Sequence, residues 1–307
     1  MTPKHTIGTI LQNAYRLGLA IPAFNIPYLP MVQPVVQAVV DLDSFALVDV
    51  ARLEWIKFEA GGPAQVAEEF ARWSQPEHVR LHLDHIPVID EDNLRVDYLP
   101  IIQEAIRLGY ESVMVDGSRL SLEENIRAIR PVVEMAHAAG VPVETELGAI
   151  MGHESGPVLP YEELYASGKG FTDPDEARRF VQETECDWLS VAIGNIHGAI
   201  AAGRKDLKKI EARLNLERLE ALKQAAGVPL VLHGGSGIQQ DNILASMRHG
   251  IAKINVATEI RQAYEVALKE TGSVAQAQQA VYERTQWVLK DFLKVDGMRA
   301  KLKEAGK

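Results

Sequence analysis

Three histidines stand close to the ends of short apolar runs in this chain, and their type and spacing suit a metal site. His85, His197 and His233 each follow such a run, and two of them precede glycine, in Asn-Ile-His-Gly and His-Gly-Gly-Ser-Gly. Three neutral imidazoles suit a zinc ion that keeps one coordination position open for substrate, whereas a closed structural site has four protein ligands. The pattern therefore predicts a metal-dependent enzyme.

The elements that must position these histidines alternate between strand-like and helix-like segments. The expected strands are Ala20–Asn25, Phe45–Val50, Val79–His85, Ser112–Ser118, Pro142–Gly148, Trp188–Gly194, Pro229–Gly235 and Ile251–Ala257. Helical spacing marks Tyr98–Leu108, Leu122–Ala139, Asp175–Thr184, Leu216–Ala226 and Gln239–Arg248. The near-continuous hydrophobicity of the strands indicates burial on both faces, so we expect an α/β fold, a single (β/α)8 TIM barrel. An open, doubly wound sheet is the weaker interpretation, because no glycine-rich dinucleotide turn follows the first strand.

The chain of 307 residues is long enough for one barrel or two smaller domains. No Pro- and Gly-rich linker divides it, so we expect one domain over 1–307 with a helical tail at about 259–307. Two connections are longer than a barrel needs, Ile86–Asp97 and Met151–Gly170, and both follow strand carboxyl ends, where barrel enzymes place their active sites.

Composition excludes several classes of partner. The formal charge of -10 opposes binding to nucleic acid or an anionic membrane, since both need a clustered positive field. Cys186 is the only cysteine, which rules out an intramolecular disulfide and a thiolate metal cluster. We find no apolar signal core and no run of about 20 apolar residues, so we expect a cytoplasmic protein without a membrane segment.

Polar residues gather at the expected strand ends, in seven of the eight units. They are Asn25, Asp84, His85, Asp116, Glu146, His197, His233 and Asn255. Asp84 and His85 are adjacent, and neighbouring strand residues face opposite ways, so both reach the same mouth only if the strand ends there. A carboxylate beside a metal ligand suggests a general base. His82 faces away from His85 by the same alternation and is expected to be an ordinary core histidine.

The segment His-Gly-Gly-Ser-Gly at 233–237 precedes a helical stretch, so it is expected to hold an anion at a helix N-terminus. A tight turn that requires glycines is the alternative explanation. The next strand ends in Lys-Ile-Asn-Val-Ala-Thr, and barrels often form a phosphate pocket from the loops after strands seven and eight. Together the two segments predict a phosphate site.

Read together, these motifs resemble the class II, metal-dependent ketose-bisphosphate aldolases, the fructose- and tagatose-bisphosphate aldolase family. The resemblance runs from Ala-Phe-Asn-Ile through His-Leu-Asp-His, Ser-Val-Met-Val-Asp-Gly-Ser, Glu-Thr-Glu-Leu-Gly, Ala-Ile-Gly-Asn-Ile-His-Gly and Leu-His-Gly-Gly-Ser-Gly to Lys-Ile-Asn-Val-Ala-Thr. It implies a zinc-dependent aldehyde-lyase that reversibly cleaves a phosphorylated ketose into dihydroxyacetone phosphate and an aldehyde, with the zinc ion polarising the ketose carbonyl.

The resemblance also implies roles for individual residues. His85, His197 and His233 would bind the catalytic zinc ion, and Asp116 and Glu146 match secondary metal ligands that suit a second divalent ion. Asp84 would be the proton shuttle, and Glu154 aligns with a loop glutamate implicated in proton transfer at the enediolate carbon. A monovalent cation, Na⁺ or K⁺, often lies near the phosphate in this family. The residues matched to substrate and phosphate binding are Asn25, Gly198, Gly234, Gly235, Ser236, Asn255, Ala257, Thr258 and Arg261.

Departures from the family pattern bear on the substrate. Ala257 stands where fructose-type members have aspartate, which favours a tagatose-like epimer. The second-strand loop lacks the usual small hydroxyl residue and glycine for the distal phosphate, and Arg52, Lys57 or Arg261 could replace those donors, Arg261 first among them. The long segment Ile86–Asp97 could reshape the aldehyde side. The substrate is therefore expected to resemble tagatose or fructose 1,6-bisphosphate, with a ketose 1-phosphate or another aldehyde half as the alternative.

Two other classes of function remain open at this point. A barrel metallohydrolase could use the same histidines and Asp84 to activate water, although it would not need the phosphate loops. A sugar-phosphate binding protein without catalysis is the other, and the presence of Asp84 argues against it. The helical tail and the resemblance also suggest a homodimer or homotetramer.

Overall fold

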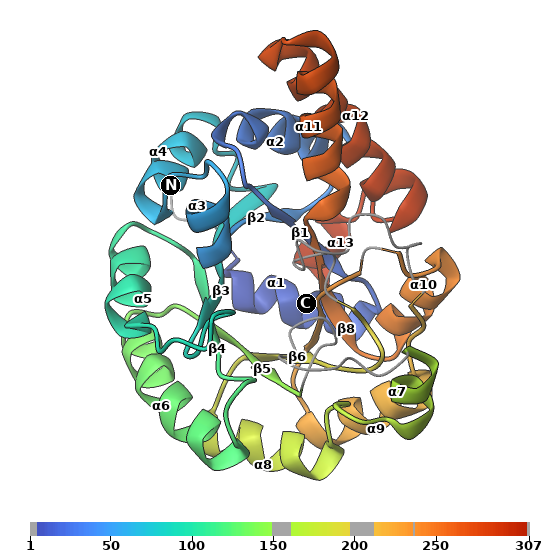
Figure 1. Cartoon of the computed structure of the whole chain (residues 1–307). Coiled ribbons are helices and arrows are strands. Elements are labelled where there is room, and N and C mark those ends of the chain that lie inside the picture. Colours follow the sequence, from blue (N-terminus) through green and yellow to red (C-terminus); the bar gives the residue numbers. More distant parts are fainter. Residues whose placement is uncertain (1–4, 149–160, 197–211, 236, 306–307) are drawn as a thin grey trace.

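A computed structural model describes residues 5–148, 161–196, 212–235 and 237–305. Eight parallel strands close into a barrel in sequence order, with helices around the outside (Figure 1). The barrel closes where β1 pairs with β8, with Ala23 opposite Asn255. The strands are β1 (Ile21–Asn25), β2 (Ala46–Ala51), β3 (Val79–Pro87), β4 (Ser112–Asp116), β5 (Val143–Leu147), β6 (Trp188–Val191), β7 (Leu230–Leu232) and β8 (Ile251–Val256). The predicted TIM barrel is confirmed.

The helices that cover the barrel follow the predicted spacing, and the five predicted from the sequence lie within one residue of their expected bounds. The helices are α1 (Ile7–Leu17), η1 (Leu29–Met31), α2 (Val32–Asp41), α3 (Arg52–Lys57), α4 (Pro63–Trp73), α5 (Tyr98–Arg107), α6 (Leu122–Ala138), α7 (Tyr161–Ser167), α8 (Pro174–Thr184), α9 (Leu216–Ala226), α10 (Gln240–Arg248), α11 (Thr258–Thr271), α12 (Val274–Trp287), the π-helical segment η2 (Val288–Phe292) and α13 (Arg299–Glu304).

Four strands end two or more residues from their predicted position, and one of them, β4, ends at Asp116 instead of Ser118. β6 and β7 end before Gly194 and Gly234, because these glycines adopt positive φ angles of 106° and 67° that extended strands do not allow. β3 instead continues two residues beyond His85, to Pro87. β6 and β7 therefore end earlier than expected, and β3 ends later.

The C-terminal helices extend beyond the barrel, as expected, beginning at Thr258. α11 and α12 lie side by side and project away from the ring (Figure 1). α13 returns to α1, where the Asn13 side-chain amide donates a hydrogen bond to the Leu302 carbonyl oxygen at 2.7 Å. Among the described helices, none has the length and apolar character to cross a membrane.

Candidate active site

A bulge in β3 brings Asp84 and His85 to the same mouth of the barrel. The register between β3 and β4 shifts between Leu83 and Ile86, and His85 has a φ angle of 32°, in the left-handed region. A bulge re-aims a side chain without ending the strand. The expectation that the strand must stop at His85 was therefore wrong: β3 continues, and the extra residue turns His85 toward the cavity.

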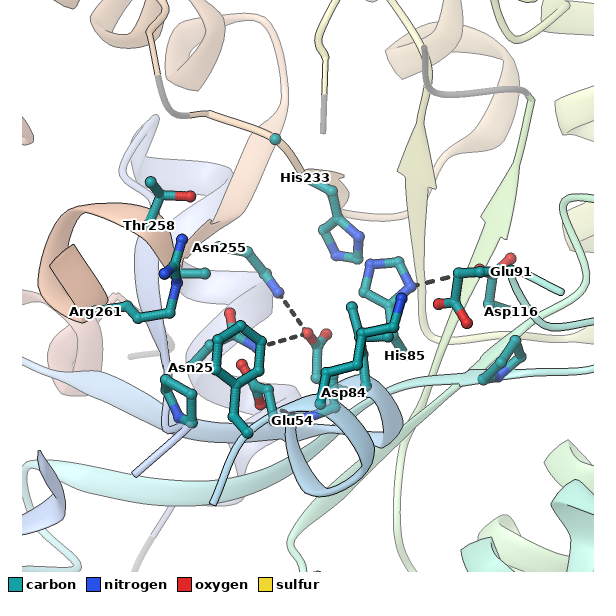
Figure 2. Close-up of a pocket in the computed structure, with 18 of the residues that line it drawn as sticks. Asn25, Glu54, Asp84, His85, Glu91, Asp116, His233, Asn255, Thr258 and Arg261 are labelled. Carbon is teal, nitrogen blue, oxygen red and sulfur yellow. Dashed lines mark hydrogen bonds and ion pairs between the residues drawn. The ribbon is translucent and has the colours of Figure 1, made fainter. Parts of the chain in front are cut away.

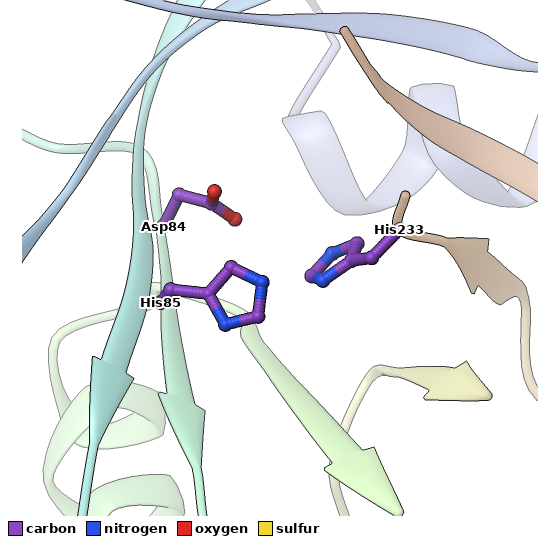
Figure 3. A group of neighbouring side chains, drawn as sticks. All are labelled: Asp84, His85 and His233. Atoms are coloured by element: carbon purple, nitrogen blue, oxygen red, sulfur yellow. The ribbon is translucent and has the colours of Figure 1, made fainter. Parts of the chain in front are cut away.

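His85 and His233 face each other across this mouth, with the Asp84 carboxylate beside them (Figure 3). Their ring centroids are 4.4 Å apart. Asp84, His85 and His233 can each offer a ligand atom with all three atoms within 4.8 Å of one another. Such spacing fits a single cation held between side chains from β3 and the end of β7.

A second group of possible metal ligands shares His85. His85, Asp116 and Glu146 also offer ligand atoms within 4.8 Å of one another, and His85 Nδ1 lies 3.4 Å from Asp116 Oδ2. Glu146 Oε2 lies 3.2 Å from His233 Nδ1, and the Ser190 hydroxyl donates to the same carboxylate at 3.1 Å. The carboxylates proposed as secondary ligands thus adjoin both imidazoles.

The charges around His85 favour a cation in this space. Burial acts to lower the pKa of His85, but the negative charges of Asp84, Asp116 and Glu146 outweigh it and raise the pKa to about 10. A site that stabilises an imidazolium so strongly also stabilises a divalent ion among the same groups. The nitrogen and oxygen donors therefore fit zinc.

Asp84 is held by two amides at the floor of the cavity (Figure 2). The side-chain amides of Asn25 and Asn255 donate to Asp84 Oδ2 at 2.9 Å and 3.0 Å. Burial acts to raise the pKa of Asp84, but Lys253, His85 and His233 outweigh it and hold the pKa well below its usual range. Asp84 is therefore an ionised carboxylate held in a fixed orientation.

The wall formed after β7 and β8 contains the residues predicted to bind phosphate. Gly234, Asn255, Ala257, Thr258 and Arg261 line the cavity together with the histidines, and Gly235 lines an adjoining hollow that also contacts Thr258. The helix after the glycine motif is α10, which begins at Gln240, one residue after its predicted start at Gln239. The helix N-terminus at this wall is instead that of α11, which begins at Thr258.

A second wall comes from α3 and from the segment after β3. It includes Leu53, Glu54, Phe58, Ile89 and Glu91. Lys57 also lines the cavity. The segment Ile86–Asp97 contributes Pro87, Ile89 and Glu91 to this wall.

The three cations considered for the distal end differ in position. Arg261 stacks its guanidinium 5.3 Å from the Phe58 ring centroid and donates to Glu265 at 2.7 Å. Arg52 pairs with Asp90 at 3.4 Å and is not among the described residues that line the cavity. Lys57 and Arg261 therefore remain candidates for an anionic group, and Arg52 does not.

Sequence reasoning missed a buried layer of charge directly beneath this site. Lys253 is fully buried and lies 2.9 Å from Glu144 Oε2 and 3.7 Å from Asp84 Oδ1. His82 lies in the same layer, with its Nδ1 2.7 Å from the Ser112 hydroxyl, so it shares the barrel interior with Asp84. The sequence did contain a signal for this layer. Residues two apart on a strand face the same side, so His82 and Asp84 can be expected to share one face of β3.

Four of the predicted site residues lie outside the described part of the chain. They are Glu154, His197, Gly198 and Ser236.

Comparison with known proteins agrees with the motifs and the geometry. The model of the class II fructose-bisphosphate aldolase family matches residues 5–305. The structure is similar to that of the YdjI aldolase from Escherichia coli K12, with 31% sequence identity, a TM-score of 0.76, and 95% of this chain and 98% of that chain covered. It is also similar to a putative fructose-1,6-biphosphate aldolase from Coccidioides immitis, with 26% identity, a TM-score of 0.76, and 97% and 99% coverage.

A fructose-bisphosphate aldolase from Campylobacter jejuni shares the fold, with a TM-score of 0.69 at 18% identity over 94% of this chain and 95% of that chain. The family match extends over nearly the whole chain, including each strand end described above. The chain therefore belongs to the class II fructose-bisphosphate aldolase family.

Proposed function

We propose that the protein is a zinc-dependent aldolase that cleaves a phosphorylated ketose into dihydroxyacetone phosphate and an aldehyde. The observation that carries this proposal is the fixed Asp84 carboxylate beside His85 and His233, in one cavity with Gly234 and Thr258. An acid-base group, a set of metal ligands and a wall suited to phosphate thus surround the same space. All three are needed for aldol cleavage of a sugar phosphate.

His85 and His233 would hold the zinc ion, with His197 as the third ligand by resemblance to the family. The chemistry that zinc supplies when bound is Lewis-acid polarisation of the ketose carbonyl. Asp116 and Glu146 surround His85 with negative charge and are candidates for a second divalent ion. We assign proton transfer at the ketone half to Glu154, again by resemblance.

Asp84 would remove the proton from the hydroxyl group whose deprotonation breaks the carbon–carbon bond. The electron pair of that bond then passes to the dihydroxyacetone-phosphate half, and the hydroxyl oxygen becomes the aldehyde carbonyl. In the condensation direction Asp84 returns the proton to the new hydroxyl group. Asn25 and Asn255 keep the carboxylate oriented, and the positive charge of Lys253 keeps it ionised between turnovers.

The phosphate of the ketone half would bind at the wall after β7 and β8. Thr258 is the first residue of α11 and lines the cavity, so the N-terminus of this helix, with the positive end of its dipole, lies at this wall. Gly234 has a φ angle of 67° and lets the backbone turn there without a side chain. Gly198, Gly235, Ser236 and a monovalent cation would complete this pocket by resemblance.

The substrate we favour is a tagatose- or fructose-1,6-bisphosphate-like ketose, with a ketose 1-phosphate as the alternative. Ala257 lines the cavity and favours the tagatose-like epimer, since fructose-type relatives carry aspartate there. Lys57 and Arg261 are the cations available to a distal phosphate. A homodimer or homotetramer is part of the same proposal and rests on the family and on the projecting helices α11 and α12.

The test is release of dihydroxyacetone phosphate from fructose and tagatose 1,6-bisphosphates and from the corresponding 1-phosphates. Each substrate is assayed with purified protein, with chelator-treated protein, and after zinc is restored. We expect chelator-sensitive cleavage that zinc recovers. Release from bisphosphates alone would favour recognition of the distal phosphate, and release from monophosphates alone would favour the alternative substrate. No release from any ketose phosphate by zinc-loaded protein would contradict the proposal.

A further inference from the structure

One carboxyl group on the wall formed by α3 and the segment after β3 has no part in the chemistry described so far. Glu54 lies on α3, and only 7% of its surface is exposed, yet it lines the cavity. Figure 2 shows its side chain on the cavity floor, next to Asn25 and Asp84. Glutamate is rarely buried in this way unless its carboxyl group has a partner.

Two donors in the described part of the chain reach this carboxyl group, whose two oxygens have room for about four hydrogen bonds. Oε2 accepts a hydrogen bond of 2.7 Å from the Ala51 backbone N–H, which caps the start of α3, and Asn25 contributes a side-chain hydrogen bond. Burial raises the pKa of Glu54 to about 8, against the opposing effect of the Ala51 bond. A helix cap alone does not require burial, because surface glutamates perform the same role in solvent.

The wall that carries Glu54 is largely apolar on the cavity side. Leu53, Phe58, Pro87 and Ile89 form much of this wall. In ligand cavities, a few placed polar groups among apolar side chains fix the orientation of the ligand. Glu54 is such a group, and its side chain lies beside Asp84 (Figure 2).

We propose that Glu54 is a specificity-determining residue that hydrogen-bonds a hydroxyl group on the aldehyde half of the substrate. The inference rests on the proposed aldolase function and specifies its aldehyde: a hydroxylated aldehyde rather than an apolar one. A site built to bond a hydroxyl group discriminates strongly against an analogue that lacks it, because the buried polar group is then left without a partner.

The experiment measures aldol condensation of dihydroxyacetone phosphate with glyceraldehyde and with propanal, two aldehydes of equal chain length. The readout is the ratio of the two kcat/KM values for the zinc-loaded wild-type protein and for Glu54→Gln. Glutamine retains an acceptor for the Ala51 N–H, so α3 remains capped. Aldehyde hydration affects both proteins equally and cancels when their ratios are compared. Glu59→Gln is the matched control, since Glu59 is exposed and is not among the described residues that line the cavity.

We expect the wild-type protein and Glu59→Gln to prefer glyceraldehyde, and Glu54→Gln to lose about tenfold or more of that preference. A purely structural role for Glu54 would lower both rates together and leave the ratio unchanged, and that result overturns the inference while the aldolase function stands. Condensation of neither aldehyde by the wild-type protein would overturn the inference together with the proposed function.

Discussion

The two walls of the cavity are built differently. The wall after β7 and β8 offers backbone groups: a glycine with a left-handed φ angle at Gly234 and the N-terminus of α11 at Thr258. The wall from α3 and the end of β3 offers side chains, among them Glu54, Lys57 and Glu91 on an apolar background. A wall of backbone groups suits one kind of ligand group, a phosphate, whereas a wall of side chains can be altered by substitution to suit another ligand.

The difference between the walls shows how one barrel can keep its reaction while its substrate changes. The proposed chemistry needs only the floor, with Asp84 and the histidines, and the backbone wall. Substitutions in α3 or after β3 leave the backbone after β7 and β8 unaltered, because α3 and the segment after β3 follow other strands of the barrel. The following predictions test whether the floor, the backbone wall and the side-chain wall act separately, starting with the largest expected effect.

Replacing Asp84 with Ala should remove the acid-base group of the floor. We expect cleavage to fall by about 10²–10⁴-fold, the usual contribution of a positioned acid or base. Zinc should remain bound, because the histidines remain. Steady-state rates together with the zinc content of the purified protein measure both effects. Asp92→Ala, on the exposed turn after β3, is the control; equal rates for the two variants would contradict this role for Asp84.

Replacing Lys253 with Met should destabilise the floor by leaving Asp49, Asp84 and Glu144 without their buried cation. We expect the free energy of unfolding to fall by about 3–5 kcal/mol, as when one partner of a buried ion pair is removed. Denaturant unfolding measures this change. Lys290→Met, at an exposed position, should change stability by less than about 0.5 kcal/mol. An equally small loss for Lys253→Met would show that the buried charges do not depend on one another.

Replacing Thr258 with Val removes the side-chain hydroxyl that lines the cavity beside the backbone N–H groups of α11, so binding of every phosphorylated ketose should weaken alike. Loss of one hydrogen bond to a charged group should raise KM about 10- to 100-fold, whichever aldehyde half the ketose carries. Thr271→Val makes the same change at the far end of α11 and should leave KM unaltered. A change in KM that depended on the aldehyde half would mean that the two walls are not separate.

Replacing Glu54 with Gln should alter the pH dependence of stability. The folded protein keeps the proton of Glu54 up to about pH 8, whereas the unfolded chain releases it near the ordinary glutamate pKa of 4.5. The folded state thus binds more protons in this window, so the wild-type protein loses stability as pH rises through it. Glutamine has no such proton.

Thermal unfolding of the wild-type protein and of Glu54→Gln, measured across this pH range at fixed metal content, tests the direction of the effect. The Tm of Glu54→Gln minus the wild-type Tm should increase from about pH 5 to about pH 8 and then level off. Glu59→Gln should show a constant difference. A difference that is flat or that decreases for Glu54→Gln would show that the buried carboxyl is ionised throughout.

The barrel itself was predictable because its signals are periodic. Val- and Ile-rich runs alternate with helices such as Leu216–Ala226, whose apolar spacing fixed both of its ends. The lengths of β6 and β7 were not predictable in the same way, since the positive φ angles of Gly194 and Gly234 depend on the loops that follow. Glycine permits such an angle but does not require it.

The site was predictable where its residues stand at strand ends, and less so elsewhere. His85, His233, Asp84 and Asn255 meet at the mouth because parallel strands all end there. The bulge that turns His85 is set by pairing with β4, a long-range contact. Glu54 escaped notice because α3 is only six residues long, too short for a periodic pattern.

We propose that the floor and the backbone wall activate the ketone half without help from the aldehyde side. The most direct test of this proposal is hydrogen exchange at the reacting carbon of dihydroxyacetone phosphate in D₂O, followed by NMR with no aldehyde present. We predict exchange with the zinc-loaded protein, loss of exchange after chelation, and recovery when zinc is restored. No exchange with the zinc-loaded protein would contradict the account.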